Sequence, residues 1–420
     1  MIKRLIPVLI LIAAGLASCI ISKDISVQNL SELYRPTEKA FHPQIEVFHQ
    51  NDSLSRVFVK FHPDELLYVR QADNEYWSEL RVNLRLLQSY ESPKVLDTAS
   101  CSFRFHIQEK GRERILFCDF PVTNKGQLLL EVFLNDVNKN LSENFYYNFD
   151  NLNSQSKQNF LVTDRRGIPL FKNYVEQNDS VMIFSNDTSR KLAFARYYYR
   201  NFPLPPPPFS FEVRESFDYK VDSMFFISIN DSIPLSFPAE GFYHIQTDTT
   251  VKDGYTLFRH SAGFPAVNRT DKMLESIRYL TTKREFEEVM NNPSPRKAID
   301  EFWYRRGGNE EKSKTLIRKY YTRVQDANRH FSSFVEGWKT DRGMIFIIFG
   351  SPNTVYRSSN SENWIYGSPN SALALNFFFT KANNPFSDND FVLSRAPVYE
   401  PHWYRAVEVW RQGRAYNSLY

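Results

Sequence analysis

The spacing of hydrophobic residues changes once along this chain of 420 residues, and this change constrains its fold more than any other feature. From residue 43 to about residue 265, apolar and polar residues alternate in short runs separated by turn residues, as in 80–86 and 101–107. Alternation places every second side chain on one face of a strand, and short strands at this spacing are typical of β-sandwiches. From about Asp271, apolar residues recur at intervals of three and four, which predicts helices. The expected fold is therefore mainly β, with an α+β domain at the C-terminal end.

The pattern divides the chain into a leader, a linking segment and three domains. We predict a signal peptide at 1–18, a polar tether at 19–42, immunoglobulin-like β-sandwich domains at 43–138 and 139–266, and a helical-then-strand α+β domain at 267–420. The 36 Phe and 23 Tyr against 14 Gly suit β-rich domains with large packed cores. A proline-rich run at 202–209 fits a stiff connector better than a ligand for an aromatic groove, because such runs are often spacers.

The N-terminal residues have the pattern of a bacterial lipoprotein signal. Lys3 and Arg4 precede an apolar run at 5–16, and residues 16–19 read Leu-Ala-Ser-Cys, which looks like a lipobox. Cleavage before Cys19 would expose that cysteine for acylation, and the lipids would anchor the chain to a membrane. An ordinary signal peptide with an incidental cysteine is the alternative. Because the acidic run that sends lipoproteins of Bacteroidota-type envelopes to the surface is missing after Cys19, we expect the periplasmic face of the outer membrane, with the cell surface as the alternative.

The two remaining cysteines lie in the first predicted sandwich. Cys101 and Cys118 flank residues 109–112, which read Glu-Lys-Gly-Arg and predict a hairpin turn with Gly111 at positive φ. A hairpin centred there would bring the cysteines to nearly opposite positions. An oxidising compartment permits a disulfide between them, and two buried free thiols are the equally weighted alternative.

Residues 337–343 form the most specific motif of the chain. The run Gly337-Trp338-Lys339-Thr340-Asp341 resembles the GWxTD signature of a family of bacterial envelope proteins. Further matching features span about 270–370: Phe302-Trp303, Tyr320-Tyr321 with Arg323, Ala327-Asn328, and Gly350-Ser351-Pro352. The chain thus resembles the GWxTD domain-containing lipoproteins of Bacteroidota-type envelopes, and the resemblance implies a location more than a reaction.

A structural role can be assigned to each signature residue from the chemistry of its side chain or backbone. We expect Gly337 to end a helix with positive φ, and Trp338 to cover the domain core. Asp341 is expected to accept backbone N–H bonds in the turn, or to pair with Arg342 or Arg323. Gly343 is expected to begin a strand at 344–349. The predicted motif residues are Gly337, Trp338, Thr340, Asp341, Arg342 and Gly343, and we favour structure over catalysis for them.

A search for catalytic and binding chemistry gives no motif. The sequence has no HExxH, no GxSxG, no phosphate-binding loop and no CxxC, so we predict no catalytic residue, no metal site and no cofactor. The 52 basic residues nearly balance the 48 acidic ones, so nucleic acid is not an expected partner. A hydrolase site assembled from distant residues stays open, because sequence does not reveal spatial constellations.

One short triplet recurs in the β-rich part. Asp followed by Ser or Thr and an apolar residue or Thr resembles the O-glycosylation acceptor of Bacteroidota envelope proteins. The candidate acceptors are Ser53, Thr98, Ser180, Ser223, Ser232 and Thr249. The alternative is that such a triplet is a turn entering a strand.

Two functional hypotheses follow. The first is a membrane-anchored scaffold or accessory subunit for protein partners in envelope assembly or secretion, held by lipid on Cys19. Its aromatic interaction surface would lie around Trp338, Trp364, Trp403 and Trp410. The second is a surface lipoprotein that binds a glycan or a peptide through its β domains.

Overall fold

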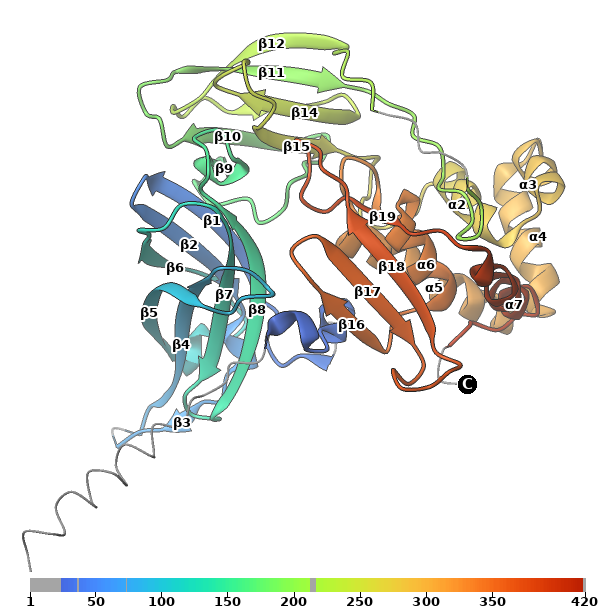
Figure 1. Cartoon of the computed structure of the whole chain (residues 1–420), viewed down its shortest axis with the longest axis horizontal. Coiled ribbons are helices and arrows are strands. Elements are labelled where there is room, and N and C mark those ends of the chain that lie inside the picture. The colour runs from blue at the N-terminus through green and yellow to red at the C-terminus, as the bar shows by residue number, and fades with distance from the viewer. Residues whose placement is uncertain (1–23, 36–37, 73, 212–216, 418–420) are drawn as a thin grey trace, which may run out of the picture.

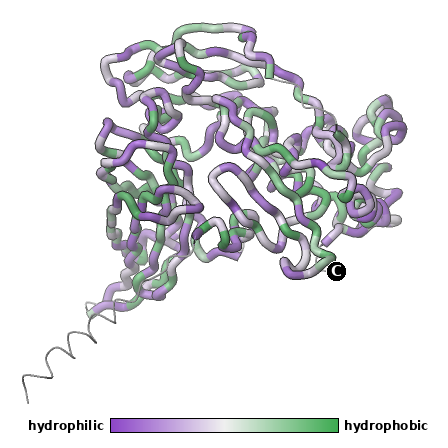
Figure 2. The backbone as a smooth tube through the Cα atoms, viewed as in Figure 1, coloured by the Kyte–Doolittle hydropathy of each residue, from purple (hydrophilic) through white to green (hydrophobic). Residues whose placement is uncertain are grey.

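The computed structural model describes residues 24–35, 38–72, 74–211 and 217–417, and Figure 1 shows two β units followed by an α+β domain. All pairs of neighbouring strands in the sheets of this described part are antiparallel. The predicted class, sandwich-like β domains followed by helices and a C-terminal sheet, is confirmed. In Figure 2, hydrophobic and hydrophilic residues alternate along the strands, which is the pattern from which the sandwiches were predicted.

The first β unit packs a three-stranded sheet against a five-stranded one. The three-stranded sheet has the order β1-β2-β6, and the larger one has the order β3-β4-β7-β8 with β5 on β4. The strands are β1 Gln44–Asn51, β2 Leu54–Phe61, β3 Val69–Arg70, β4 Tyr76–Leu87, β5 Val95–His106, β6 Arg114–Pro121, β7 Gln127–Asp136 and β8 Leu141–Asp150. On β4, Leu80, Val82, Leu84 and Leu86 are all fully buried. Strand β8 pairs with β7 along its whole length, so this sheet extends past the predicted boundary at residue 138.

Cys101 and Cys118 form a disulfide with their Cα atoms 6.0 Å apart. The expected hairpin between them is wrong, because β5 pairs with β4 whereas β6 pairs with β2 in the facing sheet. The turn at Gly111, which has the expected positive φ of 74°, carries the chain from one sheet to the other. The disulfide therefore links the two sheets of the sandwich.

Replacing both cysteines by serine should lower the free energy of unfolding by about 3 kcal/mol, because the bond closes a loop with a sequence separation of 17. The check is the urea midpoint with and without a reductant. Wild type should lose stability on reduction, and the double variant should not respond. An unchanged wild-type midpoint after reduction would contradict the prediction.

The second β unit contains a three-stranded sheet, β13-β10-β9, and a four-stranded sheet, β12-β11-β14-β15. Its strands are β9 Phe160–Asp164, β10 Ser180–Ser185, β11 Leu192–Tyr198, β12 Ser223–Ser228, β13 Leu235–Ser236, β14 Gly241–Gln246 and β15 Tyr255–Arg259. Between β11 and β12 the chain makes a long excursion that includes the proline-rich run. Leu204 and Phe209 of this run pack against the C-terminal core, and the Ala396 N–H donates to the Pro208 carbonyl over 3.1 Å.

The C-terminal domain places helices on a four-stranded sheet of order β16-β17-β18-β19. Its elements are α2 Thr270–Ser276, α3 Lys283–Met290, α4 Pro295–Gly307, α5 Glu310–Phe331, α6 Asp341–Phe349, β16 Thr354–Arg357, β17 Ser361–Tyr366, β18 Leu375–Lys381, β19 Phe391–Leu393 and α7 Glu400–Arg411. Short 3₁₀ turns lie at Ile25–Val27, Ser31–Tyr34, Pro63–Glu65, Ile107–Glu109, Lys157–Asn159, Ile277–Leu280, Gly337–Lys339 and Pro397–Tyr399. Thr282 and Glu285 form the predicted capping box at the start of α3. In the described part of the chain, none of the helices has both the length and the apolar character that crossing a membrane requires.

Residues 344–349 form helix α6, so the predicted strand is wrong. The Thr340 side chain accepts the Gly343 N–H and caps the helix start, and Gly350, with φ of 85°, ends it. Every residue of α6 is buried. Periodicity could not identify this helix, because an element that is covered on all sides is apolar on all sides.

The segment that follows residue 23 is docked rather than a free tether. Ile25 is buried against Leu87 and Leu129 of the first sandwich. Nine residues later, Tyr34 is buried in the core of the C-terminal domain. Between them, the Leu30 N–H donates to the Val355 carbonyl over 2.8 Å. Asn29 of this polar segment also accepts the Val355 N–H of β16 at its Oδ1 over 3.0 Å. A few apolar side chains fix the segment between the two domains.

Candidate functional site: the polar core around the signature

The signature turn is joined to the end of α5 by side-chain hydrogen bonds. The Gly337 N–H donates to Ser332 Oγ over 2.8 Å, and the Trp338 N–H donates to Asn328 Oδ1 over 3.2 Å. Thr340 Oγ1 donates to the Gly337 carbonyl over 2.7 Å while it accepts the Gly343 N–H. These bonds satisfy backbone groups that a helix end and a helix start would otherwise leave unpaired.

Both signature glycines are required by close backbone approach. A Cβ on Gly337 would lie 2.0 Å from the Ala327 carbonyl oxygen, and one on Gly343 would lie 1.9 Å from the Gly337 carbonyl oxygen. The expected positive φ at Gly337 is wrong, since neither residue is among those with positive φ. The two glycines let α5, the turn and α6 pass at backbone contact.

Asp341 connects the signature to the last strand and to the proline-rich run. Its carboxylate accepts the Leu393 N–H over 2.9 Å and pairs with the Arg395 guanidinium. Arg395 also donates to the Pro206 carbonyl over 3.2 Å. The expected pairing of Asp341 with Arg342 or Arg323 is therefore wrong. The backbone N–H that Asp341 accepts belongs to β19 and not to the turn, where Thr340 accepts the Gly343 N–H instead.

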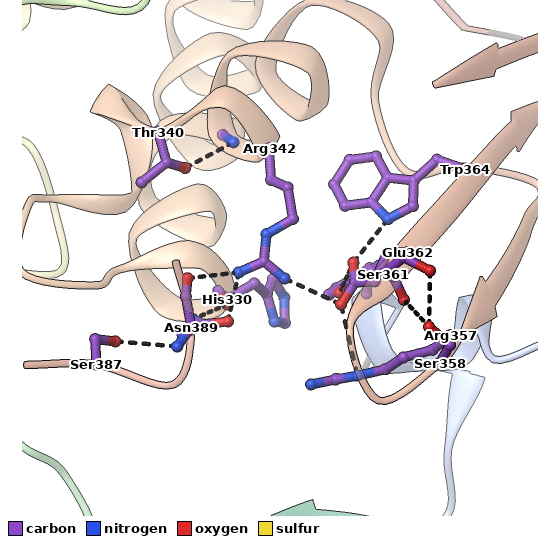
Figure 3. Close-up of polar contacts among 12 residues, drawn as sticks. His330, Thr340, Arg342, Arg357, Ser358, Ser361, Glu362, Trp364, Ser387 and Asn389 are labelled. Atoms are coloured by element: carbon purple, nitrogen blue, oxygen red, sulfur yellow. Dashed lines mark hydrogen bonds and ion pairs between the residues drawn. The ribbon is translucent and has the colours of Figure 1, made fainter. Parts of the chain in front are cut away.

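Arg342 forms a fully buried ion pair with Glu362 of β17, shown in Figure 3. Arg342 Nη1 lies 3.0 Å from Glu362 Oε1, and Arg342 Nη2 donates to the Asn389 carbonyl over 2.8 Å. The other Glu362 oxygen accepts the Tyr34 hydroxyl over 2.8 Å and the Trp364 indole N–H over 3.0 Å. One carboxylate thus collects bonds from the N-terminal segment, α6 and its own strand.

The electrostatics of this carboxylate follow from its neighbours. Burial alone would raise the pKa of Glu362, but the Arg342 and Arg357 guanidinium groups and the two hydrogen bonds outweigh burial and hold the pKa below its usual range. Arg357 Nε lies 3.6 Å from Glu362 Oε1. Glu362 is therefore an ionised, fully covered group.

Arg323 has a separate role at the end of α6. Its Nη1 donates to the Ile347 and Ile348 carbonyls over 3.1 and 3.3 Å, and its Nη2 donates to the Tyr416 carbonyl over 2.6 Å. These acceptors include carbonyls that the end of a helix leaves without internal donors. Arg323 therefore ties α6 to the C-terminal residues.

A small hollow lies beside the signature turn, next to the polar core. The hollow beside Trp338 has a volume of about 10 Å³ and is lined partly by Lys272, Asn328 and Glu336. Such a volume is about that of one water molecule. Among the residues that the structure describes, no group of three or more His, Cys, Asp or Glu side chains could hold a metal ion. The arrangement can brace the domain, and its charged groups are directed inward.

The aromatic surface expected around four tryptophans is wrong. Trp338, Trp364, Trp403 and Trp410 are all buried in the C-terminal core. Each packs against other rings, as Trp410 does against Tyr320 with ring centroids 5.4 Å apart. Their large apolar area stabilises the interior of the domain and is not open to a partner.

The remaining predicted residues lie apart from this core. Cys19 is outside the described residues. Of the candidate glycosylation sites, Ser180 is half-buried and the others are exposed on the two β units: Ser53, Thr98, Ser223, Ser232 and Thr249. The structure thus brings the signature residues together and leaves the candidate glycosylation sites dispersed.

Sequence reasoning missed the partners of the signature. Glu362 carried a usable signal, because it lies two residues before Trp364 and alternation puts both on the same buried face of β17. Arg395 and Asn389 carried no such signal, since both follow the last strand that shows a clear alternation of apolar and polar residues. Tyr34 was read as part of the tether.

Comparison with known proteins supports one domain assignment. The chain matches the GWxTD domain family over residues 241–412, so it contains a GWxTD domain that begins with β14 of the second β unit. No curated protein matches the chain. Among solved structures, the crystal structure of red sea bream transglutaminase matches with 10% sequence identity and a TM-score of 0.20. The match covers 55% of this chain and 33% of that one, so the chain spans about a third of that structure's length, and a score this low carries no argument about activity.

Proposed function

We propose that the chain is a lipid-anchored envelope lipoprotein that acts as a scaffold or accessory subunit for protein partners in envelope assembly or secretion. One observation carries the proposal. The charged side chains of the signature, Asp341 and Arg342, are used in bonds within the fold, and Lys339 lies 3.3 Å from Glu336. Such a domain supplies a rigid body rather than a reactive centre.

The proposed anchor would hold this body close to the membrane. Only residues 20–24 separate Cys19 from Ile25, which is already packed in the first sandwich. Six peptide steps span at most roughly 20 Å when fully extended. The lipid would thus attach directly to the segment that joins the first sandwich to the GWxTD domain, and the protein would lie on the membrane surface.

Changing Cys19 to alanine should remove incorporated palmitate and release the chain from the membrane fraction, because acyl chains supply the anchoring energy. The measurement is metabolic labelling followed by fractionation. The variant with Cys101 and Cys118 both changed to serine should keep its label. A wild-type chain without label would contradict the anchor.

Crosslinking in native membranes tests the scaffold role. Affinity purification of the tagged chain should recover an envelope assembly or secretion component in stoichiometric amount. Recovery of the chain alone would count against an accessory subunit.

Binding of a glycan or a peptide at the cell surface is the second candidate, because Tyr199 and Phe211 of the second β unit are exposed aromatic residues. Protease treatment of whole cells separates the two candidates. A surface protein would be cleaved, whereas a periplasmic one would be protected.

A further inference from the structure

Residues 29–35 lie across one edge of the C-terminal sheet and insert a single tyrosine into the GWxTD domain. The chain leaves the first sandwich after Ile25 and returns to it at Phe41, which is fully buried in that core. Between these two points Glu32 is exposed, whereas Tyr34 is only 6% exposed. The segment is thus a loop of the first sandwich whose tyrosine is held by another domain.

The pocket that receives Tyr34 has aromatic walls and a charged end. The Tyr34 ring centroid lies 5.0 Å from that of Phe331 and 5.2 Å from that of Trp364. The hydroxyl donates to Glu362 Oε2 over 2.8 Å, and the other oxygen of this carboxylate faces Arg342. A buried carboxylate needs hydrogen-bond donors for both of its oxygens. The pocket therefore favours a phenol over a plain phenyl ring.

The edge of β16 holds the same segment through its backbone. Strand β16 is the first strand of the β16-β17-β18-β19 sheet, so in the described part of the chain no strand pairs with its outer side. The Val355 carbonyl accepts the Leu30 N–H over 2.8 Å, and the Val355 N–H donates to Asn29 Oδ1 over 3.0 Å. Arg35 Nη2 donates to the Pro352 carbonyl over 2.6 Å. Backbone bonds to a sheet edge, together with a side chain in a pocket, are a common mode of peptide recognition.

The pocket and its occupant come from different parts of the chain. The pocket residues and β16 lie within 241–412, the range that matches the GWxTD domain family, whereas residues 29–35 lie outside it. Figure 1 shows the N-terminal segment in blue beside β16. The matched domain thus contains a site for a tyrosine, and the tyrosine that fills this site is supplied from elsewhere.

We propose that the β16 edge and the pocket behind it form a peptide-binding site of the GWxTD domain, specific for an extended segment that carries a tyrosine. Residues 29–35 fill the site within the folded chain, and a tyrosine-bearing segment of a partner protein competes with them for it. This inference rests on the proposed scaffold function and names the surface that takes the partner. The partner segment bonds to Val355 through its backbone and to Glu362 through its phenol.

Hydrogen exchange of the full wild-type chain tests whether the occupant can leave. The amides of Leu30 and Val355 should exchange through a local opening, roughly tenfold or more faster than the Trp364 amide on the central strand β17. Surface loops open at a lower free energy than core strands, and this loop inserts mainly one side chain. Equal exchange rates at the three amides would show that the loop opens only when the domain unfolds, and would overturn the proposal.

A synthetic peptide with the sequence of residues 28–35 tests the site in the full-length chain in detergent. Covalent attachment gives the native loop an effective concentration on the order of millimolar. Asn29→Ala weakens that loop, because the Asn29 side chain bonds both to the Val355 N–H and to the Asn353 carbonyl. By calorimetry the peptide should therefore bind the Asn29→Ala chain roughly tenfold more tightly than wild type.

A matched peptide and two further variants make the test specific. The same peptide with phenylalanine in place of tyrosine should bind the Asn29→Ala chain roughly tenfold more weakly, because it cannot donate to Glu362. Adding Glu362→Gln should reduce this ratio to about threefold or less, since the hydrogen bond is no longer charge-assisted. Adding Leu373→Ala instead, at a side chain that is 90% exposed, should leave the ratio unchanged.

Equal affinity of the tyrosine and phenylalanine peptides for the Asn29→Ala chain would overturn the proposal, as would the absence of binding at millimolar peptide. If a stoichiometric envelope partner is recovered and the tyrosine peptide does not displace it, the site is refuted and the scaffold function stands. If the peptides bind as expected and no partner is recovered, the site stands and the scaffold function is refuted.

Discussion

Replacing Gly343 by alanine should destabilise the GWxTD domain by about 3 kcal/mol, the upper part of the usual range for overpacking a core. Alanine in a helix interior ordinarily stabilises by about 1 kcal/mol relative to glycine, so the expected sign is reversed. The reason is local. The added Cβ would lie 1.9 Å from the Gly337 carbonyl oxygen and 2.8 Å from its carbon, and both are backbone atoms of the buried signature turn. Neither can rotate away, so α6 itself must shift.

Urea unfolding followed by tryptophan fluorescence measures this effect, because Trp338 and Trp364 lie in the same core. Gly308→Ala is the matched control. The φ of Gly308 is 73°, but a Cβ there meets nothing within 4 Å. Gly308→Ala should therefore lower the free energy of unfolding only by the cost of the left-handed conformation, about 1 kcal/mol. A Gly343→Ala midpoint equal to or above that of Gly308→Ala would show that the close approach is not required.

The sequence predicts most of the β architecture because those strands bury one face. On β4, polar Arg81, Asn83 and Arg85 alternate with buried apolar residues, and such alternation is legible without any knowledge of the neighbouring strands. The same rule failed for α6, which is buried on every side and has no polar face to reveal its period. It also failed at Cys101 and Cys118, where a turn of hairpin type connects two sheets instead of two paired strands.

The candidate site was predicted only in part, for a related reason. The signature residues and their structural role are readable because turn, cap and glycine chemistry is local. Their partners are set by contacts between distant parts of the chain. Tyr34 and Glu362 are 328 residues apart in sequence, and nothing in the composition of either segment indicates that they meet. A tyrosine in a polar segment and a charged residue on a strand are both common, and neither indicates a contact by itself.

The buried ion pair gives the second large effect. Glu362→Ala should destabilise the domain by about 3–5 kcal/mol, because it leaves buried guanidinium groups without their carboxylate. Arg342 and Glu362 have side-chain exposures of 2% and 0%. By contrast, Arg284→Ala should change stability by less than about 1 kcal/mol, because its ion pair with Glu288 is 90% and 61% exposed. The combined variant with Arg342→Met and Glu362→Gln should recover part of the loss, since it removes one of the two guanidinium charges that face Glu362 and leaves only that of Arg357.

The pH dependence of unfolding distinguishes a charge effect from a packing effect at Glu362. Its pKa in the folded chain is held below the ordinary value of 4.5, so the folded state favours the ionised form. The stability that it contributes is therefore fully present above about pH 4.5 and is lost as the pH falls through the folded pKa. Glu362→Gln, which keeps the shape of the side chain, should be destabilised at pH 7 and should lose less stability than wild type between pH 4.5 and pH 3. If the two chains show parallel acid profiles, Glu362 is not ionised in the fold, and the buried cluster is held by hydrogen bonds alone.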